Sequence, residues 1–299
     1  MTGLLLIVLA RVFVDDDSEK AAVPNDSEKT AIAAIEKWGG RVDVEERVLD
    51  TPVVGVTLSN TSVTDAELAY VKDFTKLRRL FLNNTRASDV GLSYLRDLAD
   101  LELLYAQNTA VTDEGLAHLT VLGGLKRLSL KHTRVTDVGL MHLNGLVSLD
   151  SLYLGETLVT DAGLVHLRRL TNLFSLGLQG TDITDAGLVH LKELPVLRRL
   201  FLNDTQVSDA GLEHIKKLTQ LSVLSLSSTQ VSDAGLVHLK EATRLKMLEL
   251  NNTRVTNQGV ERLRLSLPNC DIRRHTPIAD ESPPADGSPV PLQAKTLVR

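Results

Sequence analysis

Histidine recurs along this chain at positions separated by 24 residues. The heptapeptide DAGLVHL stands unchanged at residues 161–167, 185–191 and 233–239, and near-copies lie between them. The series has six members: His118, His142, His166, His190, His214 and His238. Histidines at a regular spacing could bind metal, relay protons or respond to pH. Which of these applies depends on how far apart the fold holds them.

The expected geometry argues against a metal ion shared by two histidines. If Leu167 marks the centre of a buried helix face, His166 lies about 100° away, on the flank. Equivalent atoms on adjacent helices are about 10 Å apart, whereas two ligands of one zinc ion must each approach to about 2.0–2.1 Å. No acidic residue follows the histidines at a fixed offset of two or three residues either. We predict packing and local hydrogen bonding for this column, with a pH-sensitive surface as the first alternative.

A column of aspartates has the same period. Each member follows a threonine or serine: Asp65, Asp89, Asp113, Asp137, Asp161, Asp185, Asp209 and Asp233. The next position in the series is Asn257. Paired carboxylates perform acid–base catalysis in glycosidases. Here each one stands at the start of a predicted helix, where free amide groups need an acceptor in any case, so we predict helix capping.

Motifs of the common enzyme classes are missing from the sequence. It contains no Gly-x-Ser-x-Gly, no Gly-x-x-x-x-Gly-Lys-Ser/Thr and no His-Glu-x-x-His. Cys270 is the single cysteine, which excludes an intrachain disulfide and a multi-cysteine zinc site. We predict no enzyme activity, no cofactor and no metal. An enzyme that uses the histidine column would instead bind stoichiometric metal, or lose activity when one histidine is changed.

The period also predicts the fold. Threonine stands at nine positions without an insertion: Thr61, Thr85, Thr109, Thr133, Thr157, Thr181, Thr205, Thr229 and Thr253. Most copies follow the frame Leu-x-x-Leu-x-Leu-x-x-Thr-x-Val-Thr-Asp-x-Gly-Leu-x-His-Leu-x-x-Leu. Alternating leucines at 152 and 154 indicate a short strand, and apolar residues at 164, 167 and 170 indicate one face of a helix. Because strands pair about 4.8 Å apart and helices about 10 Å apart, the stack must curve. We predict an α/β solenoid, a horseshoe with a parallel sheet on the concave side and helices on the convex side.

These repeats resemble the leucine-rich repeat family. The run Leu77-x-x-Leu80-x-Leu82-x-x-Thr85 follows the family signature, except that threonine stands where many members have asparagine or cysteine. A buried hydroxyl can form the same hydrogen bonds at the turn as an amide. The resemblance covers residue 53 to about residue 273. Its Thr-Asp-x-Gly-Leu half is similar to the bacterial, ribonuclease-inhibitor-like branch, and also to the repeats of F-box ubiquitin-ligase receptors.

Composition divides the chain into five parts. We expect a short hydrophobic N-terminus and acidic linker over 1–24, and an N-terminal cap of helix and edge strand over 25–52. Nine repeats follow over 53–268, then a C-terminal cap strand over 269–275. The proline-rich segment 276–299 is expected to be a disordered tail. In the N-terminal cap, Ile32, Ile35 and Trp38 are expected to cover the leucines of the first repeat.

Charge and hydropathy limit the partners and the compartment. A net charge of −5 gives no field that attracts nucleic acid or anionic lipid. The apolar residues 1–14 are too short to span a bilayer, but they could be a truncated export signal, which is the one membrane link that we expect. An export signal would favour a location in the cell envelope or outside the cell. If the first residues are instead a wrongly assigned start of the protein, the cytoplasm is favoured.

The outward strand positions are where the copies differ most. The middle residues of the strands are Thr57, Phe81, Tyr105, Ser129, Tyr153, Gly177, Phe201, Ser225 and Glu249, so four of the nine phenylalanines and tyrosines of the chain share one column. The outward column before it holds Arg79, Arg127 and Arg199, and the one after it holds Asn83, Gln107, Lys131, Gln179, Asn203 and Asn251. Aromatic and arginine side chains among amides are typical of protein-binding hot spots. The competing interpretation is that β-propensity alone favours aromatic residues on strands.

The sequence therefore predicts a non-catalytic module that binds a protein or peptide on its concave sheet. A preformed surface loses little entropy when a ligand docks. The candidate contact residues are Phe81, Tyr105, Tyr153, Phe201, Arg79, Arg127, Arg199, Lys131, Asn83 and Gln107. One alternative is a substrate receptor of a ubiquitin-ligase-type complex, which needs an F-box that residues 15–52 are too short and polar to supply. Another is a structural envelope protein without a specific ligand.

Overall fold

The computed structural model describes residues 26–44 and 52–275. The predicted export signal at 1–14, the linker that follows it, part of the predicted N-terminal cap and the predicted tail at 276–299 lie outside the described residues.

One sheet of eleven strands follows the order of the sequence. Its strands are β1 (Arg41–Val44), β2 (Val53–Thr57), β3 (Arg79–Phe81), β4 (Leu103–Tyr105), β5 (Arg127–Ser129), β6 (Ser151–Tyr153), β7 (Ser175–Gly177), β8 (Arg199–Phe201), β9 (Val223–Ser225), β10 (Met247–Glu249) and β11 (Asp271–Arg273). β1 pairs antiparallel with β2, and every later pair is parallel. Partners in the parallel pairs are 24 residues apart, as Leu104 is from Leu128. Equivalent residues of successive repeats therefore lie side by side.

Helices form the opposite wall. The α-helices are α1 (Asp26–Lys37), α2 (Asp65–Leu68), α3 (Asp89–Ser93), α4 (Asp113–Ala117), α5 (Asp137–Met141), α6 (Asp185–Leu188), α7 (Asp209–Ile215) and α8 (Asn257–Ser266). Short 3₁₀ helices lie at Val71–Asp73, Gly163–Arg169, Val189–Glu193 and Gly235–Leu239. Within the repeats these helices are shorter than the sequence predicts, and some are 3₁₀. At Leu170 the chain leaves the helical conformation, so that Leu170 and Leu173 can both enter the core.

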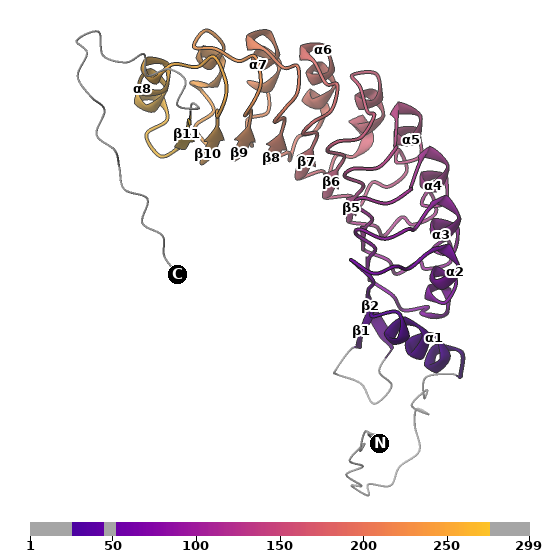
Figure 1. The fold of residues 1–299 in the computed structure, drawn as a ribbon. Coiled ribbons are helices and arrows are strands. Elements are labelled where there is room, and N and C mark those ends of the chain that lie inside the picture. The colour runs from indigo at the N-terminus through magenta and orange to yellow at the C-terminus, as the bar shows by residue number, and fades with distance from the viewer. Residues whose placement is uncertain (1–25, 45–51, 276–299) are drawn as a thin grey trace, which may run out of the picture.

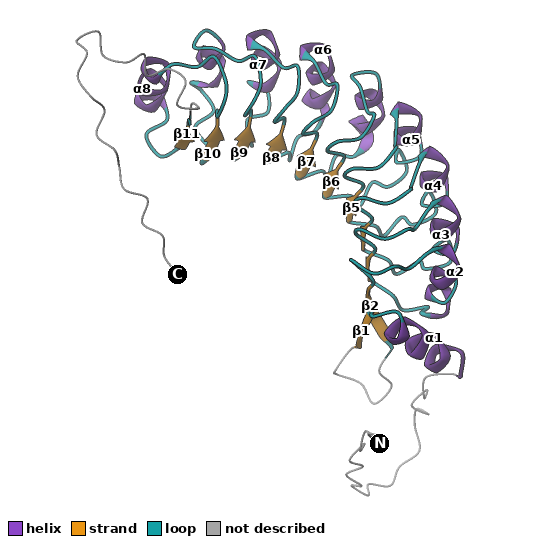
Figure 2. Ribbon diagram, in the orientation of Figure 1, coloured by secondary structure: helices purple, strands orange, loops and turns teal. Residues whose placement is uncertain are grey.

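The chain forms an open arc with the strands along its inner side and the helices along its outer side (Figure 1). Figure 2 shows that loops connect the two walls in each repeat. The predicted horseshoe with a parallel sheet on its concave side is thereby confirmed. Its core is a single cluster of buried leucine and valine side chains that continues from the first repeat to the last.

Two further columns fix the turn after each strand. Each threonine of the nine repeats donates its hydroxyl to the backbone carbonyl three residues before it, at 2.5–2.8 Å. The residue just before the threonine has a positive φ: Asn60, Asn84, Asn108, His132, Glu156, Gly180, Asp204, Ser228 and Asn252. Asparagine and glycine adopt this conformation most readily. Asn84 also donates its amide to Asn60 at 2.7 Å, which ties one turn to the next.

The two ends of the arc differ from the repeats. Ala31 and Ile35 of α1 are buried against the first repeat, and Ile32 packs beside them. Trp38, expected to join them, is 39% exposed, because α1 ends at Lys37 and the ring lies instead beneath the Lys37 ammonium. At the other end β11 adds one parallel strand to β10. Over residues 26–44 and 52–275, no helix has the length and apolar character needed to cross a membrane.

Candidate functional site

The aspartate column joins neighbouring repeats. The Thr184 hydroxyl accepts from the N–H of Ala186 and so caps its own helix. The carboxylate of Asp161, one repeat earlier, accepts from the N–H of Thr184 at 2.8 Å and from its hydroxyl at 2.5 Å. The eight aspartates all make this pair of bonds, at 2.7–2.8 Å to nitrogen and 2.5–2.7 Å to oxygen. The predicted helix capping is thus made by the hydroxyl, whereas the carboxylate binds the start of the next repeat.

Glycine leaves the space that this carboxylate fills. A Cβ atom added at Gly115 would lie 2.5 Å from Oδ1 of Asp89. The first repeat has no aspartate before it, and there Glu67 stands in the glycine position and accepts from the N–H and hydroxyl of Thr64. At the other end Asn257 has no following repeat to hold, and accepts from Arg274. Every position of the aspartate column, from Asp65 to Asn257, therefore makes hydrogen bonds within the protein.

The histidine column lies half-buried on the flank of the helices, as predicted. His118 Nδ1 lies 3.0 Å from Nε of Arg96, and His190 Nδ1 lies 2.8 Å from a guanidinium nitrogen of Arg168. Burial, and then the neighbouring arginine, lower the pKa of both imidazoles, so they are neutral acceptors at pH 7. Across residues 26–44 and 52–275, no group of three or more His, Cys, Asp or Glu side chains could hold a metal ion. Burial raises the pKa of the Cys270 thiol to about 11, which keeps it protonated.

The concave sheet brings the aromatic column together. Phe81 and Tyr105 contact each other edge to face, with ring centroids 5.6 Å apart and an interplanar angle of 88°. Further along, the Arg199 guanidinium lies 5.5 Å from the ring centroid of Phe201, a cation–π distance. Phe81, Tyr105 and Phe201 are thus each in contact with another side chain of the concave face.

A hollow of about 530 Å³ lies between the two aromatic groups. Its lining comes from β4–β8 and the residues next to them: Tyr105, Arg127, Asp150, Ser151, Tyr153, Phe174 and Arg199. The hollow exists because small residues alternate with large ones. Ser151 and Ser175 stand between Arg127 and Arg199 in one column, and Gly177 stands between Tyr153 and Phe201 in the next.

Charges in the hollow are only partly balanced. Asp150 lies 3.9 Å from Arg127 and accepts the hydroxyl of Ser151 at 2.6 Å. Arg199 has no acidic partner among residues 26–44 and 52–275. Burial, and secondly the nearby Tyr153, raise the pKa of the Tyr105 hydroxyl, so it remains a hydrogen-bond donor at neutral pH. The Ser129 hydroxyl, in the same column between Tyr105 and Tyr153, is buried without a hydrogen-bond partner in the described chain.

The structure groups some of the predicted contact residues and separates others. Tyr105, Tyr153, Arg127 and Arg199 share the hollow. The others lie outside its lining: Phe81, Phe201, Arg79, Asn83, Gln107 and Lys131.

Two of these outer residues have bonds within the protein. Arg79 pairs with Asp43 at 3.5 Å, and Asn83 accepts from the N–H of Gln107 at 3.1 Å.

Sequence reasoning missed Asp150, Ser151 and Phe174. Their signal was present: Ser151 interrupts the arginine column, and Asp150 and Phe174 belong to the variable column just before the strands. Asp150 and Phe174 precede the strands, so the period-two alternation of the strand residues does not mark them.

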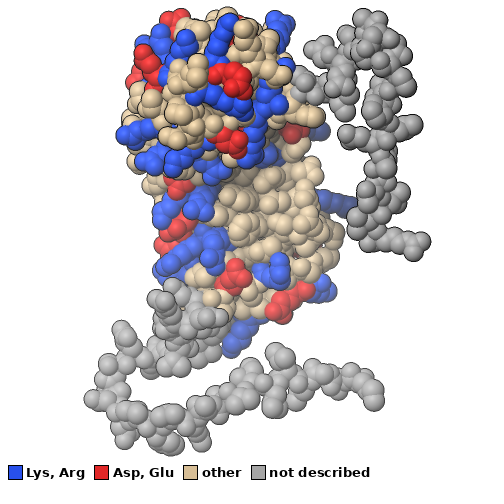
Figure 3. Space-filling view, turned by 90° about the vertical axis from the view of Figure 1, so that its left-hand side faces the viewer, with Lys and Arg blue, Asp and Glu red and all other residues tan. Residues whose placement is uncertain are grey.

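The view from the open side of the arc shows how charge is distributed (Figure 3). Below the C-terminal repeats, basic and acidic side chains gather along one edge of the inner face, and a broad area beside them carries none. In the sequence, Arg78, Arg79, Lys126 and Arg127 stand at or just before the starts of strands. Amides and hydroxyls follow the strands on the other side.

Comparison with known proteins adds evidence about the fold. No protein-family model and no curated protein sequence matches the chain. Among solved structures, an internalin (inlF) of Listeria monocytogenes is 21% identical, covers 85% of this chain and 91% of its own, and superposes with a TM-score of 0.50. An internalin C2 (inlC2) of the same organism is 20% identical, covers 85% of this chain and 94% of its own, and gives a TM-score of 0.49.

At this level of identity a likeness concerns the fold alone. It agrees with what the chain itself shows: in-phase repeats, an in-register parallel sheet on the concave side and short helices on the convex side. On these grounds, the chain has a leucine-rich-repeat fold.

Proposed function

We propose that this protein is a non-catalytic binding module that recognises a protein or peptide at the concave hollow. One observation carries the proposal: Tyr105, Arg127, Tyr153 and Arg199, from four different strands, line a single hollow of about 530 Å³. Tyrosine and arginine are enriched in binding hot spots, which favour pockets that exclude water. A cavity of a few hundred Å³ accepts one or two side chains of a ligand.

The chemistry of the lining suggests what those side chains are. Two tyrosine rings and Phe174 offer apolar walls, so an aromatic or aliphatic side chain of the ligand can be buried between them. Arg199 offers a guanidinium without an acidic partner in the described chain, which a carboxylate can bind in bidentate fashion. We therefore favour a ligand segment that carries an apolar side chain next to a carboxylate.

β-Propensity explains less than this proposal does. It accounts for tyrosine and phenylalanine on strands, but it does not account for serine and glycine between them. Ser175 and Gly177 have small side chains that add little packing to the sheet face. Ser175 lies next to Arg199, and Gly177 lies between Tyr153 and Phe201. A sheet selected for strand stability alone would not need that alternation.

The test is affinity capture from native lysate and from envelope fractions. The wild-type protein is compared with the double variant Tyr105→Ala and Tyr153→Ala, and with a convex control, Val138→Ala and Met141→Ala, whose side chains are 57% and 54% exposed. Proteins captured by the wild type and the control should be lost from the concave variant. Thermal unfolding of all three shows whether the fold is intact.

Capture that is equal for all three proteins would refute the concave site. Capture of nothing specific by the folded wild type would favour the structural envelope protein. Recovery of ubiquitin-ligase components would favour the substrate receptor, whose F-box would have to involve residues outside those described.

A further inference from the structure

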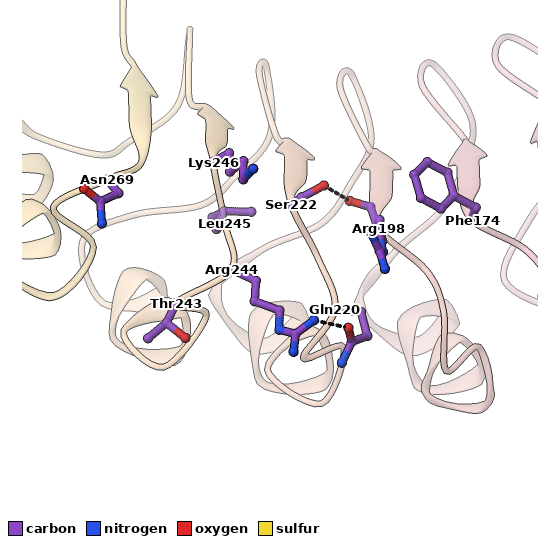
Figure 4. A pocket seen from close by; sticks show the side chains of 9 residues that line it. All are labelled: Phe174, Arg198, Gln220, Ser222, Thr243, Arg244, Leu245, Lys246 and Asn269. Atoms are coloured by element: carbon purple, nitrogen blue, oxygen red, sulfur yellow. Dashed lines mark hydrogen bonds between the residues drawn. The ribbon is translucent and has the colours of Figure 1, made fainter.

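A second, larger hollow lies on the lateral edge of the arc, where the chain enters the strands of the C-terminal half. Its volume is about 610 Å³, and its lining spans the repeats from β7 to β11. The lining residues are Phe174, Arg198, Gln220, Ser222, Thr243, Arg244, Leu245, Lys246 and Asn269. Figure 4 shows that the side chains extend across several successive repeats, with Ser222 and Lys246 near the strands and Thr243 and Gln220 nearer the helical turns. We call this hollow the lateral groove.

The lateral groove is basic. Arg198, Arg244 and Lys246 belong to its lining, and none of the nine lining residues is acidic. Arg244 donates to Gln220 at 2.6 Å, and Arg198 lies over the ring of Phe174 at 5.6 Å. Neither contact neutralises a positive charge. Lys246 makes no ion pair within the described chain.

The same positions are neutralised in the N-terminal half. Lys126 occupies the column of Lys246 and pairs at 3.0 Å with Glu102, one repeat earlier. Lys76 occupies the column of Arg244 and pairs at 3.2 Å with Asp100, one repeat later. Toward the C-terminus the acidic members of these two columns are replaced, by Ser222 beside Lys246 and by Gln220 beside Arg244. In these two columns, the acidic partners that stand beside Lys76 and Lys126 have no counterpart beside Arg244 and Lys246, which line the groove.

The dimensions select an elongated ligand. The groove crosses four strand spacings, which is about 19 Å at about 4.8 Å each. An extended peptide rises about 3.3 Å per residue, so about six residues fit along it. Gln220, Ser222 and Asn269 provide amides and a hydroxyl that can bond a peptide backbone. A single phosphate or carboxylate would leave most of this length empty.

From these observations we propose that the lateral groove binds an extended acidic peptide segment of a partner protein, with its carboxylates on Arg198, Arg244 and Lys246. This inference goes beyond the concave site and stands independently of it, since the two hollows share only Phe174.

The probe is a fluorescein-labelled peptide of eight glutamates, followed by fluorescence anisotropy on the full chain. Peptides of eight glutamines and eight lysines are the controls for charge. The variant Arg244→Gln with Lys246→Gln removes two cations of the groove. Its matched control, Lys76→Gln with Lys126→Gln, removes two lysines from the same columns and changes the net charge equally.

We expect the glutamate peptide to bind and the other two not to. Loss of Arg244 and Lys246 should weaken binding roughly five- to twentyfold, since two partly exposed charge pairs are lost. The matched control should change it less than about twofold, because its lysines already have acidic partners. Added salt should weaken binding, as screening requires. The variant Tyr105→Ala with Tyr153→Ala should bind the glutamate peptide normally even if concave binding is lost.

Three results would overturn the proposal. The first is no binding of the glutamate peptide by the wild type at low salt. The second is an equal loss in both double variants, which would mean that net charge alone attracts the peptide. The third is complete displacement by inorganic phosphate at the peptide's own concentration, which would mean a compact anion site. Circular dichroism of each variant excludes unfolding as the cause.

Discussion

At the scale of residues, the bond between Asp161 and Thr184 explains why the heptapeptide DAGLVHL barely varies. The Thr184 hydroxyl donates to the Asp161 carboxylate and accepts from the N–H of Ala186. A negative charge at the start of a helix is favourable, so each aspartate stabilises the helix of the next repeat. Gly187, three residues after Thr184, must be glycine because the Asp161 carboxylate fills the space that a side chain would occupy.

Replacing Asp161 by alanine should lower the free energy of unfolding by about 2–3 kcal/mol, since two hydrogen bonds to a charged group are lost. Urea denaturation with an unchanged m-value measures this. Asn257→Ala is the matched control, because the exposed Asn257 occupies the same column without a following repeat and accepts a hydrogen bond from Arg274 instead. It should change stability by less than about 0.5 kcal/mol. Equal effects at both positions would contradict the bridging role.

The first repeat makes a pH prediction. Hydrogen bonds from Thr64 lower the pKa of Glu67. The unfolded chain therefore binds this proton more tightly than the folded one. The stabilisation is full above the unfolded pKa of about 4.3 and is lost as pH falls through the folded pKa. We expect the stability advantage of the wild type over Glu67→Gln, measured in urea, to shrink from about pH 6 to about pH 3. A constant difference over that range would show that the carboxylate has no such role.

At the scale of elements, the short helices depend on close approach between repeats. Gly115→Ala would place a Cβ atom 2.5 Å from Oδ1 of Asp89, whose carboxylate also holds Thr112. We expect a loss of about 1–3 kcal/mol in unfolding free energy, as for other overpacked sites. Gly123→Ala is the control, because nothing lies within 4 Å of its added Cβ atom. A Gly115 variant as stable as the Gly123 variant would show that the helices can move apart at no cost.

Strands were easier to predict than helices. Because Leu152 and Leu154 must both face the core, the sequence allows only one register for this strand. β6 begins at Ser151, one residue before Leu152. The apolar positions 164, 167 and 170 fit a longer helix than the chain forms, because periodicity does not show that Leu170 must turn into the core. Local spacing therefore gave the type of element and its buried face, but not its length.

The candidate site was predicted in part for a related reason. The repeat length of 24 residues determines which residues of successive strands lie side by side. Tyr105, Tyr153, Arg127 and Arg199 could therefore be predicted as contact residues from the sequence. The hollow depends on which small residues lie between large ones across five strands, and on the column that precedes the strands. Asp150 and Phe174 belong to that preceding column, and the structure shows that they line the hollow.

At the scale of the molecule, each repeat contacts its two neighbours through the same bonds. Stability in such a solenoid is approximately a sum of repeat and interface terms. Deletion of residues 158–181 removes 24 residues and keeps every column in register. We expect this variant to unfold cooperatively and to keep its circular dichroism per residue. Deletion of residues 158–169 breaks the register and should disrupt the fold. A folded 12-residue deletion would contradict the column-by-column account.

The molecule also has two surfaces that differ in chemistry. The concave hollow combines aromatic rings with arginine, and the lateral groove combines cations with amides. Phe174 lines both, so one partner could extend from the first surface onto the second. The helical wall, where the heptapeptide repeats, supports these surfaces by fixing the spacing of the strands.

If the concave hollow is the binding site, substitutions in it must weaken the binding of a ligand, which a dissociation constant measures. A peptide selected from a random display library on the wild-type protein is titrated by calorimetry. The three titrated proteins are the wild type, the variant Tyr105→Ala with Tyr153→Ala, and the convex control Val138→Ala with Met141→Ala. We predict at least about tenfold weaker binding for the concave variant, because hot-spot tyrosines are removed, and an unchanged constant for the control. Constants that agree within about twofold for all three folded proteins would contradict the account.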